Sequence, residues 1–157
     1  MDLVHRALLL LHLLAVIVWV GGMVFAHFFL RPAAQSLEPP LRVQLMQGVL
    51  QRFLGAVGGA VAVVLASGVW MIGRAARQAA QAGGSFSMPL GWAAMAVLGL
   101  VMAAIFGHIR FALFPRLRRA VAAADWPAGG KALAGIRRWV AVNLVLGSLT
   151  VAVAVLS

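Results

Sequence analysis

The feature that most constrains this chain is an apolar segment near its start that is long enough to cross a lipid bilayer. The segment runs from Arg6 to Arg31, and residues 7–30 contain no Lys, Arg, Asp or Glu. A helix needs about 20 predominantly apolar residues to span the hydrocarbon core of a membrane. The segment therefore predicts a transmembrane helix over about residues 3–30, which the Arg31-Pro32 pair is expected to end.

Three further apolar runs follow the first, and basic residues stand beside them. They cover residues 53–73, 88–109 and 139–157. The whole chain is 64% hydrophobic, has a mean hydropathy of +1.02 and contains no cysteine. Four strands cannot close a barrel, and lipid does not accept an open sheet edge. We therefore predict an all-α integral membrane four-helix bundle, forming a single domain over residues 1–157.

The basic residues predict how the bundle is oriented in the membrane. Of the 13 Lys and Arg residues, ten lie in the first and third loops between the apolar runs, and three, Arg6, Arg74 and Arg77, lie on the other side. Such residues gather on the cytoplasmic side of membrane proteins. We expect both termini on the periplasmic side of a bacterial inner (cytoplasmic) membrane, with several passes. The net charge of +10 then reflects anchoring in the lipid bilayer, and we expect no nucleic-acid partner.

Most of the histidines share one face of the first helix. At about 100° per residue, that face collects His5, His12, Val16, Trp19, Met23 and His27. Polar side chains in a membrane helix face the bundle interior and need partners there. The pattern favours a functional role above all for His12, which lies well inside the apolar run, whereas His5 and His27 could also be interfacial anchors.

Depth in the membrane divides the candidate ligands into two sets. The outer set is His12, with His5, Met71 and Met88 as helpers, and His and Met ligands suit copper, thioethers favouring Cu(I). The inner set is His27 and His108, which could supply the axial ligands of a b-type haem. Met88, Met95 and Met102 are spaced seven apart, which is typical of a packing seam.

Acidic residues are too few and too peripheral for most membrane enzymes. Asp2, Glu38 and Asp125 all lie outside the apolar runs, which argues against a carboxylate-based proton pump or hydrolase. We assign no catalytic residue; if the chain is an enzyme, it is a haem-dependent membrane oxidoreductase. Asp125 before Trp126-Pro127 predicts a helix N-cap, and we expect Pro115 and Pro127 to divide the third loop into short interfacial pieces.

Several short motifs resemble those of the CopD family of bacterial inner-membrane proteins. The first helix contains Leu11-His12-Leu13-Leu14-Ala15, Trp19-Val20-Gly21-Gly22-Met23 and Leu30-Arg31-Pro32; further on come Arg52-Phe53, Ser67-Gly68, Gly107-His108, Asp125-Trp126-Pro127, Ile136-Arg137-Arg138 and Asn143-Leu144. The resemblance implies a four-helix membrane unit associated with copper uptake or tolerance. Longer family members have extra helices, so we expect a core unit that can form a homodimer. The first helix is also similar to that of HemJ-type protoporphyrinogen oxidases, which bind haem.

Three functions stay open from the sequence. The first is copper binding, transport or tolerance of the CopD type, with a periplasmic copper protein as a partner. The second is a b-type haem protein for electron transfer or quinone-linked redox chemistry. The third is a structural subunit or assembly factor whose histidines are only packed.

Overall fold

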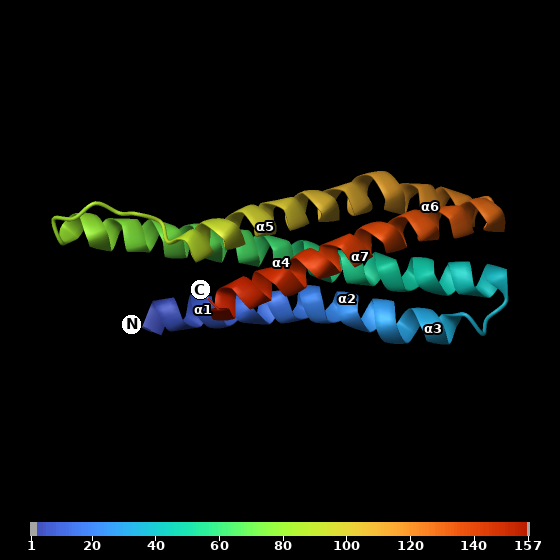
Figure 1. Cartoon of the computed structure of the whole chain (residues 1–157). Coiled ribbons are helices and arrows are strands. Elements are labelled where there is room, and N and C mark those ends of the chain that lie inside the picture. The colour runs from blue at the N-terminus through green and yellow to red at the C-terminus, as the bar shows by residue number, and fades with distance from the viewer. Residues whose placement is uncertain (1–2, 157) are drawn as a thin grey trace.

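A computed structural model describes residues 3–156 of the chain. These residues form four long helical rods (Figure 1). The rods consist of α1 (Leu3–Val16), η1 (Ile17–Gly21), α2 (Gly22–Phe25), η2 (Ala26–Leu30) and α3 (Arg31–Ala34); α4 (Pro39–Gln81); α5 (Leu90–His108), η3 (Ile109–Leu113) and α6 (Phe114–Ala122); and α7 (Trp126–Leu156). Each rod is long and apolar enough to cross a membrane. No strand occurs between residues 3 and 156. The prediction of an all-α bundle with four membrane helices is confirmed.

The first rod does not end at Arg31-Pro32, and the expectation that it would is wrong. The helix continues through α3 to Ala34. Pro32 follows closely on the π-helical turn η2. A π-helical turn is wider than an α-helical one and already interrupts the regular i→i−4 bonds. The proline ring therefore finds room there, and its missing N–H costs little.

The third loop is also shorter than expected, because its two prolines lie within helices and do not separate them. Pro127 lies in the first turn of α7, where a missing N–H would have had no partner in any case. Pro115 lies inside the third rod and, like Pro32, follows closely on a π-helical turn, η3, where the regular i→i−4 bonds are already interrupted. The expected cap is confirmed: the Asp125 carboxylate accepts a hydrogen bond of 3.0 Å from the backbone N–H of Ala128. The connection shrinks to residues 123–125.

The membrane helices likewise differ in extent from the apolar stretches that revealed them. The second rod covers Pro39–Gln81 in place of 53–73, the third begins at Leu90 rather than 88, and the fourth begins at Trp126 rather than 139. For the second rod, the amphipathic residues after Pro40 already indicate such an extension. The ends of these helices are polar, so a hydropathy pattern does not detect them. Hydropathy therefore locates only the central, apolar part of each helix.

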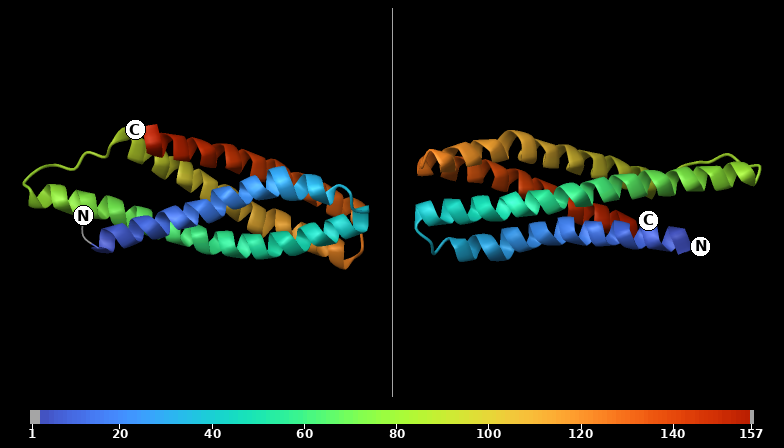
Figure 2. Two further views of the ribbon diagram at one scale, coloured as in Figure 1. Left: turned by 90° about the horizontal axis from the view of Figure 1, so that it is seen from below. Right: turned by 180° about the vertical axis from the view of Figure 1, so that it is seen from behind.

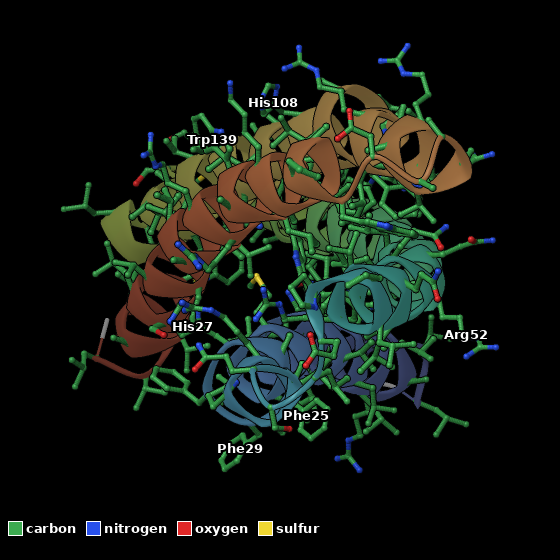
Figure 3. All side chains as sticks on the ribbon, turned by 90° about the vertical axis from the view of Figure 1, so that its right-hand side faces the viewer. Phe25, His27, Phe29, Arg52, His108 and Trp139 are labelled. Carbon is green, nitrogen blue, oxygen red and sulfur yellow. The ribbon has the colours of Figure 1, made fainter. Side chains whose placement is uncertain are left out.

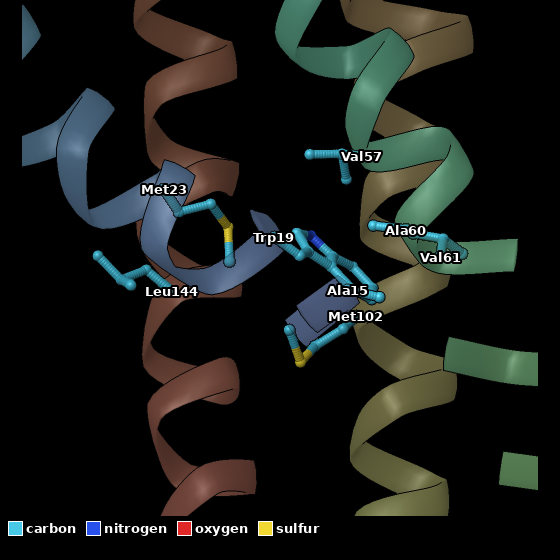
Figure 4. Packing of buried hydrophobic residues seen from close by; sticks show 8 residues of the cluster. All are labelled: Ala15, Trp19, Met23, Val57, Ala60, Val61, Met102 and Leu144. Carbon is cyan, nitrogen blue, oxygen red and sulfur yellow. The ribbon is translucent and has the colours of Figure 1, made fainter. Parts of the chain in front are cut away.

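Two groups of buried side chains hold the rods together. The first lies midway along the bundle and joins the first rod to α4, α5 and α7 (Figure 4). Its members are Ala15, Trp19, Met23, Val57, Ala60, Val61, Met102 and Leu144. The second lies nearer α6 and consists of Val43, Leu50, Leu54, Ile105, Ile109, Phe114, Leu117 and Ile136. Phe25 and Phe29, by contrast, point away from the bundle (Figure 3) and are exposed, as suits a face toward lipid.

The two ends of the bundle differ. Chain segments 35–38 and 123–125 lie at one end, which we name the basic end after the arginines around it, and the start of α1 and the end of α7 lie toward the other (Figures 1 and 2). The last turns of α4 and segment 82–89 project beyond that other end. The termini therefore share a side of the bundle; that this side is periplasmic stays a prediction.

Candidate functional site

A hydrogen bond between His12 and Ser67 joins α1 to α4 inside the apolar part of the bundle. His12 Nδ1 lies 2.7 Å from Ser67 Oγ. Ser67 is only 3% exposed, and its Oγ also contacts the backbone carbonyl oxygens of Val63 and Val64. A carbonyl oxygen accepts and cannot donate, so the single hydroxyl proton of Ser67 belongs to this carbonyl contact. Ser67 Oγ is therefore the acceptor, and His12 Nδ1 carries the donating N–H.

This arrangement sets the tautomer of His12. A neutral imidazole carries one N–H, so a proton on Nδ1 leaves the lone pair on Nε2. The bond to Ser67 involves Nδ1 only, so the lone pair on Nε2 is not used by it. The ring also lies against the backbone of α4, since a Cβ built on Gly68 would stand 3.9 Å from His12 Cε1. His12 is thus a fixed, half-buried Lewis base, which is what a metal-ligating histidine with a second hydrogen-bond partner offers.

Ser67 is the residue that sequence reasoning did not assign to the site. In the sequence it stands only as part of the Ser67-Gly68 motif. The signal was present, because Ser67 is the single hydroxyl-bearing side chain in the second apolar run, residues 53–73. A histidine in an apolar helix needs a polar partner, and an antiparallel second helix offered one candidate.

The other members of the predicted outer set lie farther from the basic end. The ring of His5 is 6.3 Å from that of Trp70, and the Arg74 guanidinium carbon lies 5.4 Å from the same indole. Met71 is half-buried and follows Ser67 by four residues, which places it on the same face of α4 one turn nearer to His5. Met88 is 42% exposed and precedes α5. His5 and His12 therefore lie at successive levels of the α1–α4 interface, and Met71 follows Ser67 on α4 at a level between them.

The predicted inner set is not gathered around one cavity. His27 lines a cavity at the basic end. His108 is exposed and does not line it. Its ring meets that of Trp139 edge to face, with centroids 5.3 Å apart. Figure 3 shows His108 and Trp139 together and His27 apart from them, beside the first rod.

Below His12, toward the basic end, the core contains two thioethers and one unpaired amide oxygen. Met23 and Met102 are 2% and 3% exposed and flank Trp19 (Figure 4). Thr150 Oγ1 lies 3.8 Å from Met102 Sδ, although it also donates to the Leu146 carbonyl at 2.8 Å. Asn143 is 2% exposed, and its Oδ1 has no hydrogen-bond partner in the described structure.

A metal site built only from the usual nitrogen, thiolate and carboxylate ligands does not occur in the described residues. Between residues 3 and 156 no group of three or more His, Cys, Asp and Glu side chains could hold an ion. Any metal bound there would need a low coordination number or thioether ligands.

Comparison with known proteins identifies the family. The model of a family described as Copper resistance protein D, CopD, matches residues 47–157. This region includes Ser67, Met71 and His108 and excludes the first rod with His5, His12 and His27. No curated protein and no solved structure matches the chain. Because the matched region is more than half of the chain, the protein belongs to the CopD family of multi-pass membrane proteins, whose name connects it with copper resistance.

Proposed function

We propose that this protein binds Cu(I) within the membrane, with His12 Nε2 as the principal ligand, as a step in copper transport or tolerance. The observation that carries the proposal is the bond from His12 Nδ1 to Ser67 Oγ. It fixes the imidazole and leaves its lone pair in an apolar region where a base without a partner would be costly.

The chemistry of the surrounding side chains favours a soft, singly charged ion. The chain has no cysteine, and its three acidic residues lie outside the apolar runs. A divalent ion would therefore enter the low-dielectric interior without a compensating carboxylate, at a cost that rises steeply with charge. Cu(I) accepts imidazole and thioether ligands, and Met71 offers a thioether one turn from Ser67.

His5 and His12 are best described as successive stations, since both cannot hold one ion. Seven residues separate them, which corresponds to about 10 Å along the helix axis. Met71 lies at a level between them. A Cu(I) ion arriving from the end that carries segment 82–89 would meet His5 first and His12 second. Met88, which is exposed at that end, could provide the first thioether contact.

The experiment is an anaerobic titration of the detergent-purified protein with Cu(I) against a chromogenic chelator. We expect one tight site in the wild type and at least about tenfold weaker binding in His12→Gln. Glutamine can still donate to Ser67 Oγ through its amide but has no imidazole lone pair, so the packing is kept. His108→Gln is the matched control and should bind like the wild type. Unchanged affinity in His12→Gln would overturn the proposal.

The methionine contribution is tested in the same assay with nearly isosteric variants. Met71→Leu should weaken Cu(I) binding, whereas Met95→Leu, on α5, should not. The absorption spectrum of the same sample distinguishes the haem alternative. A Soret band in the wild type that disappears in His27→Ala would show that the protein binds haem through His27. This result would contradict the proposal.

A further inference from the structure

A cavity of about 550 Å³ opens at the basic end between three of the four rods. The first rod contributes residues from Ala26 to Ala34, with Gln35 directly after it; α4 contributes from Pro39 to Leu50, and α7 contributes from Trp126 to Val140. None of its lining residues comes from α5 or α6. Figure 3 looks onto this end of the bundle, with His27 beside the first rod.

The charged side chains of the cavity all have the same sign. Arg31, Arg42 and Arg137 line it, and no acidic residue does. In the described structure none of these three arginines has a carboxylate partner, and the nearby Glu38 and Asp125 are exposed and outside the lining. Three guanidinium groups around one partly apolar space repel each other, so the complementary occupant is an anion.

The rest of the lining is largely apolar. Val43, Leu50, Ile136 and Val140 lie on the cavity wall, and all four belong to the buried or half-buried packing of the bundle. Trp126 stands in the first turn of α7, and tryptophan is typical of the membrane–water interface. The cavity therefore combines an arginine-rich part with a hydrocarbon part at the level of lipid headgroups.

We propose that this cavity binds one anionic phospholipid, with the phosphate held by Arg31, Arg42 and Arg137 and an acyl chain lying along the apolar wall. Arginine recognises phosphate oxygens through paired N–H groups, and basic pockets between membrane helices are suited to lipid headgroups. An inorganic phosphate ion has the same headgroup chemistry but gains nothing from the apolar wall. The proposal does not depend on the copper ligands, none of which lines the cavity.

The test is a titration of the purified full chain in a neutral detergent with short-chain phosphatidylglycerol, followed by native mass spectrometry. The cavity variant replaces Arg31, Arg42 and Arg137 by Gln. Its matched control replaces Arg116, Arg118 and Arg119 by Gln, which are three arginines of α6 outside the cavity. Both variants lose three charges at the same end of the molecule. We expect the cavity variant to bind at least about tenfold more weakly and the control to bind like the wild type. Equal losses in both would mean unspecific surface attraction and would overturn the proposal.

Two further measurements test whether the occupant is a lipid that fills the cavity. Ala134→Trp keeps every arginine and fills the cavity at an exposed lining position, so it should also weaken binding of phosphatidylglycerol; wild-type binding in this variant would overturn the proposal. Inorganic phosphate should not compete with the lipid at equal concentration, and full competition would assign the site to free phosphate instead.

If the triple cavity variant loses helical circular dichroism, a single substitution is used in its place. Arg137→Gln is then the cavity variant, and Arg118→Gln is its control.

Discussion

Phe53 of α4 fills the space that a side chain on Gly22 would need. A Cβ built on Gly22 would overlap the edge of the Phe53 ring and stand 3.0 Å from its Cζ. The neighbouring Gly21 has nothing within 4 Å of such a Cβ. Of the two adjacent glycines, only Gly22 allows the close approach of the first rod and α4, the same two rods that hold His12 and Ser67 together.

Gly22→Ala should therefore destabilise the fold and Gly21→Ala should not. The added methyl group displaces the Phe53 ring from its packed position, and overpacking of this kind costs about 1–3 kcal/mol. Thermal unfolding in detergent, followed by circular dichroism, should show a lower Tm for Gly22→Ala. Gly21→Ala adds the same methyl group toward open space and should unfold like the wild type. Equal Tm values for the two variants would mean that the Phe53 contact is absent.

Ser67→Ala should lower copper affinity without removing the site. The variant keeps His12 but no longer fixes its tautomer and ring orientation, and loss of such an outer partner typically costs about 10–100-fold in metal affinity. The chelator competition assay measures the effect. Ser148→Ala is the control, because the Ser148 hydroxyl donates to the Leu144 carbonyl within its own helix, at 3.0 Å. Wild-type copper affinity in Ser67→Ala would contradict the role given to this hydroxyl.

Asn143→Leu should leave the fold as stable as the wild type or make it more stable. The variant replaces a buried amide whose Oδ1 has no partner in the described structure by an apolar group of similar size. An unsatisfied buried acceptor costs about 1–3 kcal/mol. Thermal unfolding checks the direction, and Thr150→Val serves as the comparison, since it removes a hydroxyl that does have acceptors. A clearly lower Tm in Asn143→Leu would show that Oδ1 accepts a bond from water or an ion.

The orientation of the bundle can be tested by cysteine labelling, which has no background because the natural chain contains no cysteine. Ser36→Cys and Ser85→Cys place exposed thiols at the two opposite ends. If the basic end faces the cytoplasm, an impermeant maleimide applied to the periplasmic side should label Ser85→Cys in intact cells. It should label Ser36→Cys only after the membrane that holds the protein is opened. The reverse pattern would invert the predicted sidedness.

Hydropathy predicted the existence and order of the four membrane helices but not their ends. The cause is specific: a proline ends a helix in most interior positions, but Pro127 lies in a first turn and Pro32 and Pro115 follow the π-helical turns η2 and η3. Sequence alone does not say which of these positions a proline occupies. The π-helical turns η1, η2 and η3 were missed for a related reason. A rotation of 100° per residue assumes a uniform helix, and each π-helical turn shifts the residues after it.

Only one of the two hydrogen-bonded residues of the candidate site, His12, could be predicted from the sequence. His12 stood out because an imidazole within an apolar run needs a partner, but the identity of that partner depended on how α1 and α4 are aligned. The cavity at the basic end had no sequence signal of its own. It is produced by the spacing of the first rod, α4 and α7, and its arginines come from three separate segments of the chain. His108 illustrates a different error. Its expected depth in the membrane grouped it with His27, but depth does not say which way a side chain points, and the ring of His108 packs against Trp139.

The length of α4 has a consequence for how far this protein extends outside a membrane. A helix of 43 residues is about 65 Å long, whereas a bilayer with its headgroups is about 40–45 Å thick. About 20 Å of this helix must therefore stand in water, and the last turns before segment 82–89 are part of that stretch (Figure 1). Anything that approaches this end of the bundle would therefore meet a helical rod before it reached the lipid surface.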